Sequence, residues 1–421
     1  MNFYMFVFST GLLFFTGMVW WHLQSGLLDC IQSGHPRAWR IALLLAVIVL
    51  NWGPLLLGRH LFASTSPFGR ALMVLSFTWM VLELWFGTAA IALDLWNLAT
   101  RLPQLLGHPD APLAKLVLRP RLVMAASLAF TILAAIVGNL QARHPIISRY
   151  DFNLPGVPAE ADGYKILLTS DIHITAGKYP SILDAVEQAI DSEHPDIILH
   201  AGDFLDGPHH GDIDDQLARI RTWHAPDGKF AVFGNHDGYA EWHHSRDAHA
   251  LAEVTLLGRR VKRPLAEIHP WLRLVGSDDP ACWMPQMYNQ KVPSIYEEGD
   301  EPDATYQDEA WNKCLEIPQV PPDGVTILLR HQPFGEDRVP PNYDLMLCGH
   351  THGGQLFPFN LVTNAFHEIR THRWYSVNSR LRIYICRGTG FWGPPFRFLV
   401  PPEITIITLH PEKQPQNDSN K

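Results

Sequence analysis

Basic residues are in the minority in this sequence, with 33 Lys and Arg against 42 Asp and Glu and a formal net charge of −9. The chain has no basic stripe and no RNA- or DNA-binding motif, so we expect no nucleic-acid partner. Cysteine is also scarce, with five residues. Cys348 and Cys386 lie in strand-like runs that indicate buried thiols. Cys282 and Cys314 flank a loop-like insertion in which a disulfide would make sense.

Charge is nearly absent from long stretches of the amino-terminal third. Residues 2–21 carry no charged side chain, and a helix of about 20 residues rises about 30 Å, the thickness of a hydrocarbon core. Later segments repeat the pattern, and we expect transmembrane helices at 2–21, 41–57, 71–93 and 122–140. The first lacks a basic start and a cleavage site, which argues against a signal peptide. Glu83, inside the third, is compatible with a functional role or with a hydrogen bond to another helix.

The loops between these segments predict an orientation. Loops after the first and third segments carry six basic residues, namely Arg37, Arg40, Arg101, Lys115, Arg119 and Arg121. The other side carries four, namely Arg59, Arg70, Arg143 and Arg149. Because the more basic loops stay in the cytoplasm, we expect a multi-pass protein of the cell (inner) membrane with both termini outside the cytoplasm and the lipid bilayer as a partner.

The chain has room for two domains. We expect a transmembrane region at 1–143, a proline-containing linker at 144–163, a second domain at 164–411 and a disordered polar tail at 412–421. Short apolar runs in the second domain predict strands at 164–170, 196–200, 229–233, 326–330 and 343–348. A helical pattern at 181–194 separates the first two runs. This alternation indicates a layered α/β domain.

Each predicted strand is followed at once by polar residues that suit metal ions. The candidate ligands are Asp171, His173, Asp203, Asn235, His331, His350 and His352. Carboxylate, amide and imidazole ligands without cysteine favour manganese, iron or zinc over a thiolate structural site. Two divalent ions about 3.5–4 Å apart, joined by a carboxylate, could activate a bridging hydroxide for attack on phosphorus. The set therefore predicts a two-metal phosphoester hydrolase.

The surrounding motifs strengthen this prediction. They are SDIH (170–173), GDFLDG (202–207), GNHDGY (234–239), LVGSDDP (274–280), LLRHQPF (328–334), GHTHGGQL (349–356) and RGTGFWGPPFRF (387–398). In this order they resemble the calcineurin-like metallophosphoesterases, and more closely the membrane-associated YkuE/YaeI-like branch, over about residues 164–410. The resemblance implies an αββα sandwich.

The resemblance also implies a role for each ligand. Asp171, His173 and His352 would hold the first ion, and Asp203 would bridge to the second. The second ion would be held by Asn235, His331 and His350.

Two neighbours of Asn235 are candidate catalytic residues. His236 could donate to a phosphate oxygen or protonate the leaving oxygen, and Asp237 is placed to orient it. Capping of a helix or turn is an equally good account of Asp237. Arg330, where many relatives carry serine, could point to the surface or contact a substrate phosphate.

Other residues near these motifs have commonplace explanations. The doublets His209-His210 and His243-His244 are better explained as surface or loop residues than as substrate contacts. The stretch Gly390–Pro402 could dip into the membrane interface, although a packed loop is the commoner fate of such residues.

The sequence thus predicts a membrane-anchored metallophosphoesterase that hydrolyses a phosphodiester or pyrophosphate by attack of a metal-bridging hydroxide. Attachment to the bilayer favours a lipid or lipid-linked substrate. A nucleotide-linked lipid precursor, cleaved at its pyrophosphate, is the alternative that the resemblance offers. An inactive, metal-containing membrane scaffold or sensor is the alternative outside the enzymes, and the complete ligand set argues against it.

Overall fold

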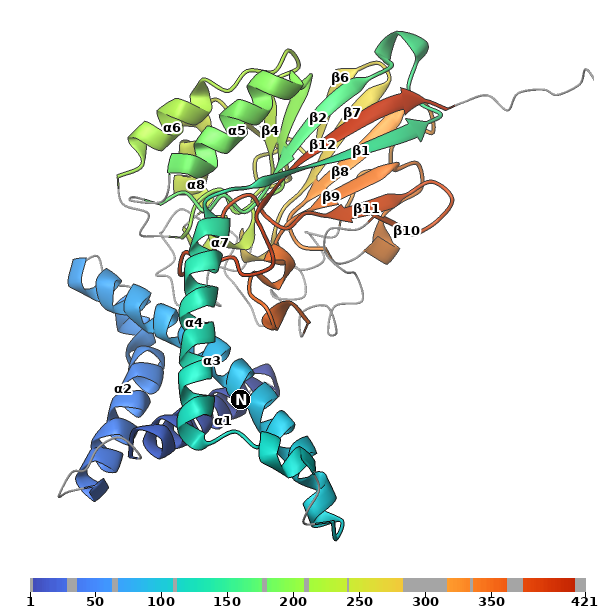
Figure 1. Cartoon of the computed structure of the whole chain (residues 1–421). Helices are drawn as coiled ribbons and strands as arrows, with labels where there is room; N and C mark the ends of the chain where they lie inside the picture. Colours follow the sequence, from blue (N-terminus) through green and yellow to red (C-terminus); the bar gives the residue numbers. More distant parts are fainter. Residues whose placement is uncertain are drawn as a thin grey trace, which may run out of the picture. The chain divides into compact units, whose positions relative to one another are not determined.

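The computed structural model describes residues 3–28, 36–62, 67–108, 112–175, 180–207, 212–240, 242–282, 316–333, 336–361 and 374–412. The chain divides into two compact units, Met1–Gly138 and Asn139–Lys421 (Figure 1). The predicted tail from residue 413 onward and Cys314 lie outside the described residues.

The first unit is helical. Its helices are α1 (Phe3–Leu28), α2 (Pro36–Phe62), α3 (Pro67–Leu105) and most of α4 (Pro120–Ala142), with a short 3-10 turn, η1 (Pro112–Leu116). Among the residues whose side chains are described, Val74–Leu105 and Pro120–Ala142 are long and apolar enough to span a membrane. The spans expected in α1 and α2 stay predictions. His22 and Asp94 join α1 to α3, with Nε2 and Oδ2 2.9 Å apart, and Glu83 is buried, which favours packing against another helix.

The linker prediction was wrong for much of 144–163. Residues Ile146–Leu154 form strand β1, which pairs in parallel with β12 (Glu403–Pro411). The turn η2 (Ala159–Ala161) follows. The prolines that suggested a linker lie on either side of this strand, at 145, 155 and 158, where they interrupt no ladder hydrogen bond. The second unit therefore begins at the end of α4 rather than after a free connection.

Two six-stranded sheets form the second unit. The first has the order β1, β12, β2 (Tyr164–Thr169), β3 (Ile197–His200), β4 (Lys229–Ala231), β5 (Thr255–Leu256). The second has the order β10 (Trp374–Ser376), β11 (Arg382–Ile385), β9 (Leu345–Cys348), β8 (Val325–Arg330), β7 (Leu272–Ser277), β6 (Leu265–His269). The helices are α5 (Pro180–Glu193), α6 (Asp214–Arg221), α7 (Asn235–Tyr239) and α8 (Trp242–Leu251), with 3-10 turns η3 (Pro280–Cys282), η5 (Glu336–Arg338) and η6 (His352–Gly354). The predicted strands and the helix after the first of them are confirmed.

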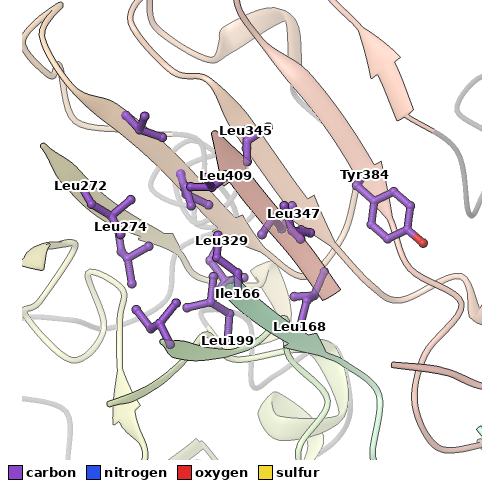
Figure 2. Packing of buried hydrophobic residues seen from close by; sticks show 14 of the residues in the cluster. Ile166, Leu168, Leu199, Leu272, Leu274, Leu329, Leu345, Leu347, Tyr384 and Leu409 are labelled. Atoms are coloured by element: carbon purple, nitrogen blue, oxygen red, sulfur yellow. The ribbon is translucent and has the colours of Figure 1, made fainter. Parts of the chain in front are cut away.

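The core lies between the two sheets, and β2 shows how the sequence builds it. Ile166 and Leu168 point toward the second sheet and pack with residues such as Leu329 and Leu347 (Figure 2). Leu167, between them, packs on the opposite face against the helices. This alternation follows from the two-residue period of a strand. Each such side chain, fully buried, contributes about 1.5–3 kcal/mol to stability.

Helices cover the outer face of the first sheet. Buried residues of α5, α6 and α8 form one apolar cluster with that face. The outer face of the second sheet is covered by residues such as Val320 and Tyr343, and no helix among the described residues packs there. Residues 283–315, between β7 and β8, lie outside the described part. The α/β fold with two sheets is confirmed, and the fourth layer of the αββα sandwich stays a prediction.

Strand direction explains where a site can form. Strands β2, β3 and β4 run parallel in the first sheet, and β7, β8 and β9 run parallel in the second. Parallel strands end at the same edge of a sheet, and ligands of α/β sheets bind beyond these carboxyl ends. The loops that follow β2, β3, β4, β8 and β9 carry all the predicted ligands.

Candidate metal centre

The backbone of the predicted ligands is unusual. Five of the seven have positive φ: Asp171 at 52°, His173 at 51°, Asp203 at 56°, His350 at 75° and His352 at 49°. Residues other than glycine adopt this left-handed conformation in only a few per cent of cases. Such strained residues gather at functional sites, where the surrounding structure holds them. The chain therefore turns sharply at three separate loops to direct side chains to one place.

The first predicted group is brought together. His173 Nε2 lies 3.0 Å from His352 Nε2, and His352 Nε2 lies 3.3 Å from Asp171 Oδ1. All three side chains are buried. Their ligand atoms lie within 4.8 Å of one another, close enough to surround one ion.

The second predicted group also converges. Asn235 Oδ1 lies 3.1 Å from His331 Nε2 and 2.8 Å from His350 Nδ1. Asn235 is the first residue of α7, which begins directly after the β4 loop. One amide oxygen and two imidazole nitrogens thus face a common point. Such a donor set suits a divalent ion of borderline softness.

Asp203 lies between the two groups. Its Oδ2 is 3.6 Å from His173 Nε2 and 3.2 Å from His331 Nε2, and its Oδ1 accepts the backbone N–H of His236 at 2.8 Å. One carboxylate oxygen therefore faces both groups while the other is held in place. Gly202 precedes it with φ of 87°, and a Cβ there would meet His331 Nδ1 at 2.7 Å. Only glycine allows this approach.

Two of the histidine rings are oriented by contacts at Nδ1, the ring nitrogen that faces away from the cluster. His173 Nδ1 lies 3.0 Å from Asp206 Oδ1, and His331 Nδ1 lies 2.7 Å from the carbonyl oxygen of Ala201. An acceptor at Nδ1 places the ring proton there and leaves Nε2 as the inward ligand atom. Metal-binding histidines are commonly oriented this way.

The electrostatics of the centre favour a cation. Burial lowers the pKa of His173 and keeps its ring neutral, although Asp206 opposes this. Burial also lowers the pKa of His331, but Asp203 outweighs it and raises the pKa to about 10. Asp203 thus holds a proton on the neighbouring ring, and a divalent ion would satisfy the same attraction. The residues present fit a metal centre in donor type, burial and spacing.

His236 and Asp237 differ in their surroundings. His236 is partly exposed, and its ring packs edge-on against His173 with centroids 4.6 Å apart. Asp237 is fully buried and accepts the backbone N–H groups of Phe204, Leu205 and Gly234 at 2.8–3.2 Å, and the Ser245 hydroxyl at 2.6 Å.

These contacts decide between the two accounts of Asp237. A carboxylate has about four acceptor positions, and all four are taken, which favours the capping alternative over orientation of His236. The nearer carboxylate is Asp206, whose Oδ1 lies 3.9 Å from His236 Nδ1. Asp206 was not among the residues predicted from the sequence, although its place in the GDFLDG motif, three residues after Asp203, was a usable signal.

Two buried arginines flank the centre. Arg330 is only 1% exposed, so the alternative in which it points to the surface is wrong. Arg397 is fully buried, and it donates to the carbonyl oxygen of His352 at 2.6 Å and to the ring Nδ1 at 2.8 Å. Burial lowers the pKa of Arg397 to about 9. Arg397 fixes the position of His352 from outside, and sequence reasoning gave it no role.

The remaining candidates are less informative. His209 and His210 lie outside the described residues. His243 packs on Trp242 in α8 with ring centroids 3.8 Å apart, and His244 is exposed. Cys348 and Cys386 are buried as expected. Cys282 is buried with Sγ 3.9 Å from the carbonyl oxygen of Gly234.

A two-sheet α/β domain with a buried cluster of carboxylate, amide and imidazole donors at its strand ends belongs to the class of metal-dependent hydrolases. Comparison with known protein families shows which family of metal-dependent hydrolases this domain resembles. Residues 164–354 match the calcineurin-like phosphoesterase family. The second unit thus contains a calcineurin-like metallophosphoesterase domain, which makes the protein a phosphoester hydrolase, and the cluster of metal-binding residues implies divalent metal ions.

Similar proteins come from bacteria and animals. Metallophosphoesterase Cj0846 of Campylobacter jejuni is 25% identical over 332 residues, which is 76% of this chain and 77% of that protein. A transmembrane protein with metallophosphoesterase domain from Danio rerio is 28% identical over 326 residues, 70% of this chain and 67% of that protein. YkuE of Bacillus subtilis is 29% identical over 265 residues, 60% of this chain and 81% of that protein. Names of relatives and two apolar helices together suggest membrane association.

Proposed function

We propose that the chain is a membrane-anchored phosphoesterase that holds two divalent ions and hydrolyses a phosphodiester or pyrophosphate bond in a lipid or lipid-linked substrate. The observation that carries the proposal is the arrangement around Asp203. One of its oxygens faces His173 of the first group at 3.6 Å and His331 of the second at 3.2 Å. A carboxylate in that position suits a pair of ions that share one ligand.

Each group would hold one ion. Asp171, His173 and His352 would hold the first; Asn235, His331 and His350 would hold the second; Asp203 would serve both. Manganese, iron or zinc suits oxygen and imidazole ligands of this kind. When bound, such ions polarise a phosphoryl oxygen and make water a strong nucleophile at neutral pH.

The protein's own residues supply the proton. His236 stands at the partly exposed side of the centre, where a leaving oxygen could reach its ring. Asp206, 3.9 Å from its Nδ1, would hold the ring with Nε2 directed outward. His236 would then pass its proton to the departing alcohol or phosphate, as general acids do. Asp206 also faces His173 at 3.0 Å, so one carboxylate would orient both rings.

A lipid substrate is favoured by the proposed attachment. A bilayer-bound substrate would reach a bilayer-bound enzyme by diffusion in two dimensions. A nucleotide-linked lipid precursor, cleaved at its pyrophosphate, is the alternative because it combines a lipid with a phosphoanhydride. Both belong to the same reaction class.

Two measurements test the proposed activity. Purified, metal-loaded protein should turn over a chromogenic phosphodiester and lose this activity with a chelator. Incubated with lipid extracts, it should release water-soluble phosphate compounds. Metal content without turnover on any of these substrates would point to a scaffold or sensor and overturn the proposal. Release of a nucleotide monophosphate would select the nucleotide-linked precursor.

The proposed location is the cell (inner) membrane, with several spans and the catalytic domain outside the cytoplasm. The balance of basic residues in the predicted loops supports this side. A reporter fused after residue 421 should be active only if the reporter requires export. A cytoplasmic signal would reverse the orientation and leave the metal chemistry untouched.

A further inference from the structure

Two segments beside the metal centre pack against each other. They are residues 355–361, which follow η6, and residues 391–400, which precede β12. Leu356 and Phe398 form a parallel bridge, and the Phe357 N–H donates to the Phe398 carbonyl oxygen at 3.0 Å. The Gln355 side chain also donates to Trp392 O at 2.8 Å and accepts Trp392 N–H at 3.0 Å. The two segments therefore form one surface.

This surface is unusually apolar. Among the described residues of the second unit, nine large apolar side chains are exposed: Leu140, Ile146, Leu251, Leu265, Phe359, Leu361, Val377, Trp392 and Leu399. Four of the nine lie on these two short segments. Phe359 is 52% exposed, Leu361 58%, Trp392 41% and Leu399 57%. Scattered apolar residues are normal on a protein surface, but a concentration of them marks an interaction site.

Leu399 adds a second sign of function. It has φ of 60°, a conformation that is a strain for leucine and easy for glycine or asparagine. A leucine that is both strained and exposed adds nothing evident to the stability of the domain. Backbone strain of this kind points to a role outside the fold.

Contacts with the end of α4 indicate which partner would cover this apolar surface. Asn139 donates to the Pro395 carbonyl oxygen at 3.0 Å, and the Leu399 N–H donates to the Gln141 side chain at 2.8 Å. Ala142, the last residue of α4, packs with Phe391. Residues Pro120–Ala142 are apolar and long enough to span a membrane. The apolar surface is therefore fastened to the end of a candidate span.

We propose that Phe359, Leu361, Trp392 and Leu399 form an interfacial surface that inserts into the headgroup region of a phospholipid bilayer. Tryptophan favours that depth because its ring has an apolar body and a polar N–H. The Trp392 ring centroid lies 6.2 Å from that of His236. Insertion would thus hold the catalytic side of the metal centre at the level of lipid phosphates. This inference rests on the membrane attachment proposed above.

Site-directed labels test the surface in the full chain, reconstituted into phosphatidylcholine and phosphatidylglycerol vesicles. A single cysteine replaces Leu361, Leu399 or the control Leu251, which is 61% exposed at the end of α8. Cys30→Ser and Cys314→Ser remove two native cysteines, and the other three are buried. Each cysteine carries bimane, which is quenched by nitroxide lipids in the bilayer and by iodide in water.

The labels at 361 and 399 should be quenched by the nitroxide lipid and shielded from iodide, and the label at 251 should behave in the opposite way. Leu399→Asn, which suits the positive φ, should reduce lipid quenching of the 361 label without changing turnover of a soluble phosphodiester. Iodide quenching at 361 and 399 equal to that at 251 would overturn the inference. Shielding from both quenchers would also overturn it, because the cover would be protein. Release of the chain by alkaline carbonate would overturn the attachment itself.

Discussion

Replacement of His236 by alanine separates proton donation from metal binding. The His236 side chain is 16% exposed, and only its backbone N–H is tied to Asp203, at 2.8 Å. Alanine keeps that backbone contact, so Asp203 should stay in place. The variant is expected to retain its metal ions and to lose only what the imidazole ring supplies.

The expected loss depends on the leaving group. A positioned general acid contributes about 10²–10⁴-fold to the rate, which corresponds to about 3–5 kcal/mol of transition-state stabilisation. An alkyl phosphodiester has a poor leaving group and should show this full loss. A nitrophenyl ester releases a stable anion that needs no proton, so its loss should be much smaller.

The assay compares turnover on both esters with metal content from elemental analysis. Equal losses on the two esters with metal retained would refute proton donation and indicate that His236 positions phosphate. Loss of metal would place His236 among the ligands, which its position near His173 and Asp203 permits. Asp206→Asn is the matched comparison, since it should reproduce the leaving-group dependence if Asp206 orients His236.

Three further changes test other parts of the structure. Asp203→Asn should abolish turnover and lower the content of both ions, because its charge faces both groups; full occupancy with normal activity would contradict this. Asp237→Ala leaves three buried N–H groups without their acceptor, and each unsatisfied group costs about 1–3 kcal/mol of stability. The variant should therefore lower the melting temperature far more than Ser245→Ala, which removes one hydrogen bond. His200 is buried, and burial, aided by His249, holds its pKa well below 6.5. Below pH 6.5 the unfolded chain binds a proton at His200 that the folded chain does not, so the free energy of unfolding falls on acidification. His200→Gln should reduce this fall by about 1.4 kcal/mol per pH unit. Parallel curves of unfolding free energy against pH for variant and wild type between pH 7.5 and 5 would refute the prediction.

The strand ends could be predicted because periodicity and polar residues coincide there. Thr169, His200 and Arg330 each end a buried run, and the candidate ligands follow within a few residues. Local sequence also accounts for α5, whose apolar positions face the first sheet. Features that depend on a single strand or helix, such as where it ends and which face it buries, could therefore be predicted from the sequence.

Roles that depend on approach in space were not accessible. Asp237 is adjacent to His236 in sequence, but the first turn of α7 directs its carboxylate back to Gly234 and the β3 loop. Asp206 is 30 positions away and approaches because β3 and β4 are neighbours. The same limit applies to Arg330, whose charge suggested the surface and whose strand position buries it.

The interlocking of the ligand loops explains how the strained backbone persists. Asp171 N–H donates to the Gly202 carbonyl oxygen at 2.9 Å, and His173 N–H donates to that of Asp203 at 3.1 Å. The His350 N–H reaches the Asp171 carboxylate at 3.1 Å. Each loop is thus held by a neighbour that itself carries a ligand. Left-handed residues cost about 1–3 kcal/mol each and survive only where the surroundings over-determine them. Because these hydrogen bonds cross between β2, β3 and β9, the two sheets preorganise the centre, and its geometry belongs to the fold as a whole rather than to any one motif.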